Sequence, residues 1–244
     1  MRNYAQELEN RVAFIQKILA ESHANGIVFG NSGGKDCTLV GILCKKACEN
    51  VLSVAMPCQS SRNFGEDMQD ALATASKFGI ENIVVDLSET KATILKAMEP
   101  HQALNQAAIA NIAPRLRMTT LYAIGQARGC LVAGTGNQCE RYMGYFTKWG
   151  DGACDFNPIA DLKVSEIYEF LEFLGAPRNI IEKAPSAGLF EGQTDESEMG
   201  VTYAEIEQMI ERGTCGNDHD EKIRRAHRIS EHKRRLPPCY GEAE

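Results

Sequence analysis

The sequence predicts an α/β protein: a single-domain doubly wound parallel sheet with helices on both faces and a helical C-terminal extension. Short apolar runs alternate with segments of helical spacing as far as residue 133, and two of these runs end in glycine-rich loops. After Pro158 the pattern is helical only. With 43% apolar and 24% charged residues, the 244-residue chain can bury a core, so we expect one domain over residues 1–244.

The first half of the chain supplies most of the predicted sheet. Residues 1–24 carry apolar side chains at helical spacing and are expected to form an N-terminal helix. The expected elements that follow are a strand over 27–29, a helix over 38–43, a strand over 51–56, a helix over 66–78, a strand over 83–85, helices over 89–98 and 115–128, and a strand over 130–133.

The second half is predicted to be helical. We expect a helix over 164–174, a short turn over 178–183, and helices over 203–211 and 219–233. The stretch 186–200 is rich in glycine and acidic residues and poor in apolar ones, which predicts a mobile lid. Residues 219–236 are expected to form a basic C-terminal helix and tail.

Charge and composition exclude several function classes. The 33 acidic and 26 basic residues give a net charge of −7, which argues against a nucleic-acid partner. No apolar run is long enough to span a membrane and the start does not resemble a signal peptide, so we expect a cytoplasmic protein with no membrane partner. The nine cysteines contain no C-x-x-C pair and are interpreted as reduced thiols.

The loop at residues 30–37 is the strongest chemical signal, because it joins the first strand to the first buried helix. Its glycines let backbone N–H groups turn toward one point, and the positive end of the helix favours an anion by about 0.3–1 kcal/mol. The sequence therefore predicts a phosphate cradle. The predicted ATP-binding residues of this loop are Gly30, Asn31, Ser32, Gly33, Gly34, Lys35, Asp36 and Cys37.

Two common nucleotide motifs do not match this chain. A Walker A loop needs a glycine five residues before Gly34 and a serine or threonine after Lys35, where the sequence has Phe29 and Asp36. The second glycine loop, 134–136, lacks the third glycine of a dinucleotide fingerprint, since Cys139 stands in its place.

An acid directly after a phosphate loop would repel phosphate unless a cation lay between them. Asp36 is therefore interpreted as a Mg²⁺ ligand, with Glu140, beyond the fourth strand, as the second carboxylate. The alternative for Asp36 is an ordinary acid at a helix N-terminus.

The S-G-G-x-D loop resembles that of the ATP pyrophosphatases, which cleave ATP between its α- and β-phosphates. Further blocks make the chain similar to the NAD synthetase family, in the family's order from about residue 27 to 236. These blocks cover residues 111–118, 134–140, 144–155, 185–187, 192–196 and 232–234.

The resemblance implies a two-step reaction with ATP as co-substrate. The nicotinate carboxylate of deamido-NAD attacks the α-phosphate and releases pyrophosphate, and ammonia then displaces AMP to give NAD. The resemblance further implies that Thr135 and Ser186 contact ATP, and that Asp151 places ammonia or accepts its proton. The residues implied to hold deamido-NAD are Arg117, Lys148, Asp155, His232 and Lys233.

The chain departs from the family pattern at three positions. Val164 stands where the family usually has a lysine, and Lys163 beside it is taken as the substitute ATP-binding residue. Gly188 replaces a frequent aspartate, and Cys37 replaces a serine and is a weaker donor.

Simpler interpretations stay open for several of these residues. Arg117 is also consistent with a solvent-exposed helix residue, and Lys148 with a side chain whose aliphatic part packs on Trp149. Residues 222–235 are also consistent with a solvated basic helix or an RNA contact. The alternative functions are another ATP pyrophosphatase, such as a tRNA-modifying ligase, and a non-catalytic adenine-nucleotide-binding protein.

The short segment before the first strand leaves no room for a glutamine amidase domain, so we expect use of free ammonia. The resemblance also implies a homodimer.

Overall fold

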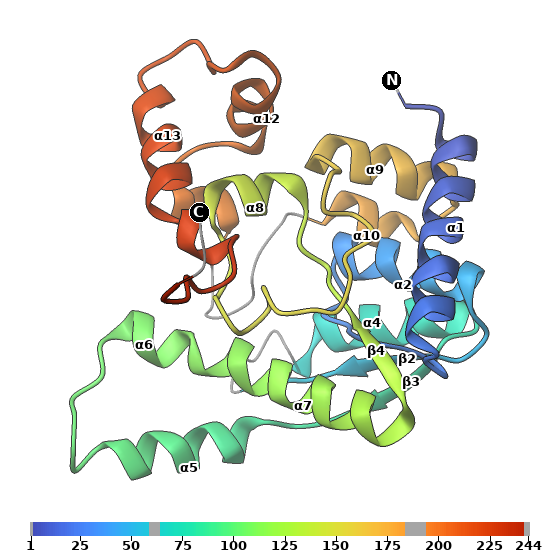
Figure 1. The fold of residues 1–244 in the computed structure, drawn as a ribbon, viewed down its shortest axis with the longest axis horizontal. Coiled ribbons are helices and arrows are strands. Elements are labelled where there is room, and N and C mark those ends of the chain that lie inside the picture. Colours follow the sequence, from blue (N-terminus) through green and yellow to red (C-terminus); the bar gives the residue numbers. More distant parts are fainter. Residues whose placement is uncertain (1, 59–63, 184–193, 242–244) are drawn as a thin grey trace.

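A four-stranded parallel sheet forms the centre of the computed structural model, which describes residues 2–58, 64–183 and 194–241 (Figure 1). The strand order is β3-β2-β1-β4. The strands are β1 (Gly26–Gly30), β2 (Val51–Ala55), β3 (Glu81–Val84) and β4 (Cys130–Ala133). The order changes direction at β1, whose two neighbours are β2 and β4, so a crevice opens beyond the carboxyl end of β1.

Alternate side chains of β1 enter two different core layers, because successive strand residues point to opposite faces. Ile27 and Phe29 are buried against the helices of one layer, whereas Val28 is buried with Leu52 and Val132 in the other. Both faces of this strand are therefore covered, which explains its continuous apolar sequence.

Helices cover both faces of the sheet, as predicted (Figure 1). The layer with Ile27 and Phe29 includes α1, α2, α4, α9 and α10, and the opposite face is covered by α7. These helices are α1 (Tyr4–Ser22), α2 (Lys35–Ala47), α4 (Glu66–Lys77), α7 (Ile112–Arg128), α9 (Val164–Phe173) and α10 (Arg178–Glu182).

The C-terminal helices pack around their own apolar cluster, centred on Ile206, Met209 and Ile223. The remaining helices are α5 (Ser88–Met98), α6 (Gln106–Ala110), α8 (Gln138–Met143), α11 (Asp195–Met199), α12 (Tyr203–Arg212) and α13 (Asp220–Ile229), followed by a 3₁₀ turn over Glu231–Lys233. Among the described residues, no helix has the length and apolar character needed to cross a bilayer.

The doubly wound fold class is confirmed, and several local predictions differ from the structure. The turn expected over 178–183 is the helix α10, β3 begins at Glu81 instead of residue 83, and α13 ends at Ile229 instead of residue 233. The sequence did not predict α6, and part of the predicted lid is a helix: Thr194 caps α11, and Asp195 is buried at its start. Residues 195–199 are therefore helical and not irregular, because local capping by Thr194 and burial of Asp195 and Met199 outweigh the polar composition. Their role in a lid stays a prediction. Residues 186–193 of that lid, including Gly188, lie outside the described residues.

Candidate active site

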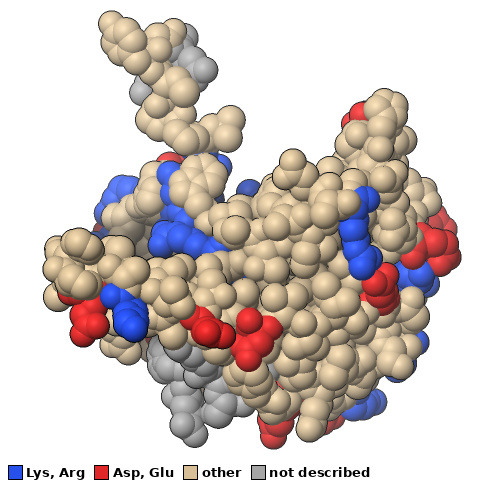
Figure 2. Space-filling view, turned by 90° about the horizontal axis from the view of Figure 1, so that it is seen from below, with Lys and Arg blue, Asp and Glu red and all other residues tan. Residues whose placement is uncertain are grey.

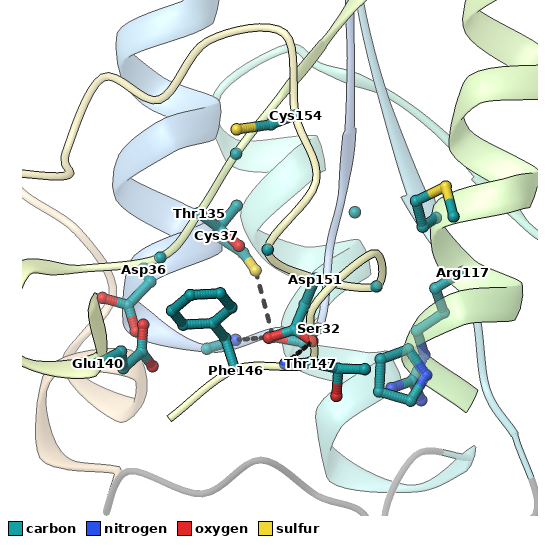
Figure 3. Close-up of a pocket in the computed structure, with 18 of the residues that line it drawn as sticks. Ser32, Asp36, Cys37, Arg117, Thr135, Glu140, Phe146, Thr147, Asp151 and Cys154 are labelled. Atoms are coloured by element: carbon teal, nitrogen blue, oxygen red, sulfur yellow. Dashed lines mark hydrogen bonds between the residues drawn. The ribbon is translucent and has the colours of Figure 1, made fainter. Parts of the chain in front are cut away.

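A cavity of about 600 Å³ opens at the carboxyl ends of β1, β2 and β4 (Figure 3). Its walls come from the loops after these strands, from α7, from the segment 144–157 and from the end of the 3₁₀ turn. Segments far apart in the sequence therefore meet here because parallel strands all end at this edge of the sheet.

The glycine loop after β1 is fixed by the buried side chain of Asn31. Its amide nitrogen donates to the Ala71 carbonyl oxygen at 3.2 Å, and its amide oxygen accepts from the Gly33 N–H at 3.1 Å. Gly33 has φ +75°, and a Cβ there would lie 2.2 Å from the Asp67 carbonyl oxygen. This backbone path consequently requires glycine.

Ser32 and Cys37 lie together at the mouth of the loop. The Ser32 hydroxyl oxygen accepts from the Gly34 N–H at 3.3 Å and lies 3.3 Å from the Cys37 sulfur. Burial raises the pKa of the Cys37 thiol, so the group stays protonated and can donate. Ser32 itself is exposed to the cavity, which leaves its hydroxyl accessible to a ligand.

Two carboxylates from different strand ends meet in this cavity, those of Asp36 and Glu140 (Figure 3). Asp36 lies in the first turn of α2, and Glu140 forms the capping box of α8 by accepting from the Asn137 N–H at 2.9 Å. Burial and the neighbouring Asp36 charge raise the pKa of Glu140 well above its usual range. Adjacent carboxylate oxygens that repel each other fit a hard divalent cation such as Mg²⁺.

Asp151 and Arg117 line another part of the cavity wall. The Asp151 carboxylate accepts from the Thr147 N–H at 2.9 Å, and desolvation by the surrounding protein raises its pKa although it faces the open cavity. The Arg117 guanidinium donates to the Met56 carbonyl oxygen at 3.0 Å. Desolvation lowers the pKa of Arg117, which remains a cation because its ordinary value is so high.

Basic side chains gather at a hollow in one face of the molecule (Figure 2). The Lys233 ammonium reaches the cavity by donating to the carbonyl oxygens of Gly144 at 2.7 Å and Phe146 at 2.8 Å. It also lies 5.3 Å from the centroid of the Phe146 ring. The end of the C-terminal segment thereby contacts the site, and its role in binding a substrate anion stays a prediction.

The family model described as NAD synthase matches residues 7–237, which is nearly the whole chain. The chain belongs to the NAD synthase family. Two relatives are the NH(3)-dependent NAD(+) synthetases of Carboxydothermus hydrogenoformans, 43% identical over 96% of this chain and 97% of the relative, and of Archaeoglobus fulgidus, 40% identical over 97% and 96%.

Two solved structures are similar to this chain over nearly its whole length. The NMN synthetase from Francisella tularensis matches with a TM-score of 0.93 and 35% identity, covering 99% of this chain and all of that one. The NH3-dependent NAD synthetase from Campylobacter jejuni matches with a TM-score of 0.80 and 30% identity, covering 98% and 99%.

Most of the predicted site residues of this NAD synthase lie on the cavity wall. Those that the structure brings together there are Gly30, Asn31, Ser32, Gly34, Lys35, Asp36, Cys37, Arg117, Thr135, Glu140, Asp151 and Lys233. Gly33 belongs to the same glycine loop, but it faces α4 and does not line the cavity.

Four further predicted residues lie outside that wall. Lys163 caps α9 and pairs with Glu211, and the Asp155 carboxylate accepts from the Val132 N–H at 2.7 Å. Lys148 lies 3.5 Å from the His232 ring nitrogen. Their ligand roles therefore stay predictions. The prediction for Ser186 falls outside the described residues.

Sequence reasoning missed two residues near the acidic pair. Asp195 is 4% exposed, lines the cavity and accepts from the Tyr203 hydroxyl at 2.8 Å. Asp195 belongs to the block over 192–196 that carried the family resemblance, so that block was a signal without an assigned role. Tyr203 gave no signal, because an aromatic residue at helical spacing is typical of a core position.

Proposed function

We propose that the protein is an ammonia-dependent NAD synthetase, which converts deamido-NAD to NAD and cleaves ATP to AMP and pyrophosphate. The observation that carries the proposal is the meeting of the glycine loop, the Asp36–Glu140 pair and Asp151 in one cavity. Relatives named as NH(3)-dependent NAD(+) synthetases support it, since they match this chain over nearly their whole length.

In the first step, the nicotinate carboxylate oxygen attacks the α-phosphorus of ATP and pyrophosphate leaves. The glycine-loop N–H groups and the Ser32 hydroxyl would bind the polyphosphate, with Thr135 on the opposite loop. Arg117 and Lys233 would hold the anionic substrate in line with the phosphorus. A sensor that only bound nucleotide would not need the acidic pair together with Asp151.

The metal ligands of the proposal are Asp36 and Glu140. When bound there, Mg²⁺ would neutralise charge on the polyphosphate. The pair can serve this purpose because Glu140 is already held by the α8 capping box, so its carboxylate needs little reorganisation.

In the second step, the ammonia nitrogen attacks the acyl carbon of the adenylate and AMP leaves with the former carboxylate oxygen. Asp151 would accept the proton that the nitrogen loses, and its raised pKa suits this task better than an ordinary aspartate would. The Thr147 N–H keeps one oxygen of this carboxylate in place.

A second candidate substrate follows from one comparison. The solved structure with a TM-score of 0.93 is named an NMN synthetase, an enzyme whose product is a mononucleotide. The same residues could activate the carboxylate of nicotinate mononucleotide, since both substrates present the same reacting group.

Homodimer assembly and cytoplasmic location remain part of the proposal. Light scattering of the purified protein tests the dimer.

One experiment separates these functions. The purified protein is incubated with ATP, Mg²⁺ and either ammonium or glutamine, with deamido-NAD or nicotinate mononucleotide as acceptor. We expect amide product, AMP and pyrophosphate with ammonium only, and the higher kcat/KM with deamido-NAD. A higher kcat/KM with the mononucleotide would support the second candidate. ADP as a product, or no amide from either acceptor, would contradict the proposed reaction.

A further inference from the structure

Lys35, the first residue of α2, places its side chain among acidic groups. It is 6% exposed, and its ammonium nitrogen lies 2.7 Å from Asp36 Oδ2 and 5.7 Å from the centroid of the Tyr203 ring. A buried lysine is normally paired, and here its partner is the carboxylate proposed to bind the metal. The ammonium therefore lies against the oxygens that the metal would need.

The surrounding charges explain why a buried ammonium is tolerated at this position. Glu140 and Asp36 are close enough for their charges to repel each other, and the Asp195 charge also acts on Glu140. Asp195 is itself held by the Tyr203 hydroxyl at 2.8 Å. The charges that act on the Lys35 ammonium are those of Asp36 and Glu140, and two carboxylates against one ammonium leave an excess of negative charge that suits a divalent cation.

The ammonium and a divalent cation cannot both use Asp36 freely. A Mg²⁺ ion binds a carboxylate oxygen at about 2.0–2.1 Å, and two positive charges only a few ångströms apart repel strongly at a site with little water. Lysine can resolve the conflict because its flexible stem lets the ammonium swing to another acceptor. The nearest new acceptor after ATP binding would be the polyphosphate, since Lys35 lines the same cavity as the glycine loop.

We propose that the Lys35 ammonium is a built-in counter-ion that holds Asp36 and competes with the divalent cation until ATP binds. ATP then supplies phosphate oxygens for the ammonium and frees Asp36 for the metal. The metal and the nucleotide consequently load together, and the nucleotide-free protein binds the metal weakly. This inference rests on the proposed function, because it takes Asp36 and Glu140 as the metal ligands.

Binding of Mn²⁺, measured by electron paramagnetic resonance on the nucleotide-free protein, tests the competition. Lys35→Gln removes the charge and should tighten Mn²⁺ binding by about tenfold or more, whereas Lys35→Arg should stay close to wild type. Lys45→Gln is the matched control: Lys45 lies on the same helix and pairs with Glu49 at 2.7 Å, but outside the cavity. Unchanged or weaker Mn²⁺ binding in Lys35→Gln would overturn the inference.

A second measurement uses the wild-type protein and does not depend on the folding of Lys35→Gln. In protein labelled with ¹⁵N-lysine, the Lys35 ammonium resonance, assigned with Lys35→Arg, should shift when Mg²⁺ is added with a non-hydrolysable ATP analogue. If the Lys35 resonance does not move although Mn²⁺ binds in the presence of the ATP analogue, the inference is refuted.

Asp36→Asn distinguishes this failure from failure of the proposed function. If Mn²⁺ binds with the ATP analogue and Asp36→Asn abolishes that binding, the proposed metal site is supported independently of the result for Lys35. If Mn²⁺ binds to none of the variants even with the analogue, both the metal site and the counter-ion role are wrong.

Discussion

The Thr147 N–H donates to the Asp151 carboxylate at 2.9 Å, and this contact fixes the acid on the cavity wall. The Thr147 hydroxyl is in turn 2.5 Å from the Asn111 amide oxygen, so Asp151 is positioned by two segments at once. One oxygen of the Asp151 carboxylate is therefore already hydrogen-bonded to the backbone of the loop. The geometry suits a group that accepts a proton more than a group that must move during the reaction.

Asp151→Asn should slow amide formation much more than adenylylation. Asparagine can still accept from the Thr147 N–H but cannot take a proton, so we expect ammonia-dependent kcat to fall by about 10²–10⁴-fold. Pyrophosphate release in a single turnover should remain. Rapid-quench measurement of pyrophosphate and NAD in the same samples gives both rates. Equal loss of the two rates would assign Asp151 to the first step instead.

Asp36→Asn and Glu140→Gln should each abolish pyrophosphate release while the fold is kept. Both remove a negative charge from the proposed metal site, and in Glu140→Gln the side-chain amide oxygen can still accept from the Asn137 N–H in the α8 capping box. We expect kcat to fall by about 10³-fold or more. Circular dichroism reports whether the helices survive.

Glu172→Gln is the control for this pair of variants. It also removes one carboxylate, but Glu172 is exposed on α9 and does not line the cavity. We expect wild-type activity from Glu172→Gln. Full activity in Asp36→Asn or Glu140→Gln would remove that residue from the metal site.

Gly33→Ala should damage ATP binding by distorting the glycine loop. The residue has φ +75°, and its new Cβ would lie 2.2 Å from the Asp67 carbonyl oxygen, so the loop or α4 must shift. Gly79→Ala separates the two effects, because Gly79 also has positive φ but a Cβ added there would meet no atom within 4 Å. We expect Gly79→Ala to cost about 1 kcal/mol of stability with normal ATP affinity. Gly33→Ala should lose at least about tenfold in ATP affinity by calorimetry.

Local sequence signals were enough to predict the sheet and the glycine loop. The strands β1, β2 and β4 are short, mostly apolar runs, and β1 is joined to α2 by the glycine loop over 31–34. The strand β3 begins at Glu81, before its apolar residues, so its start was not predicted. Asp36 and Glu140 could be paired in advance because parallel strands end at one edge of the sheet. These predictions needed only chain order and the rule for where such sheets bind ligands.

Tertiary contacts decided what the sequence could not predict. The Asp155 carboxylate is turned to the Val132 N–H and the Tyr122 hydroxyl, although its neighbour Asp151 faces the cavity. The position of Lys163 depends on Glu211, which comes from a helix much later in the chain. Asp195 reaches the acidic pair because Tyr203, on the following helix, holds it there. None of these orientations has a local signal in the sequence.

Glu205 should make the stability of the C-terminal helices depend on pH. Its carboxylate accepts from the Thr202 N–H at 2.7 Å and from the Asn217 side-chain amide at 2.6 Å, and it lies 2.8 Å from the His219 ring nitrogen. Together these contacts lower the pKa of Glu205 to about 2 from an ordinary 4.5. The stabilisation is therefore complete above about pH 4.5 and disappears as the pH falls toward 2. Glu205→Gln should lower the free energy of unfolding by about 1–2 kcal/mol at pH 7, and by about half of that or less at pH 3.

Urea unfolding of wild type and Glu205→Gln at both pH values measures this difference. Glu172→Gln, an exposed position on α9, removes the same charge and should match wild type at each pH. If Glu205→Gln is destabilised equally at pH 7 and pH 3, the prediction is wrong. Glutamine would then differ from glutamate for reasons independent of protonation, so hydrogen-bond geometry and not the carboxylate charge would hold α12 to the turn before α13.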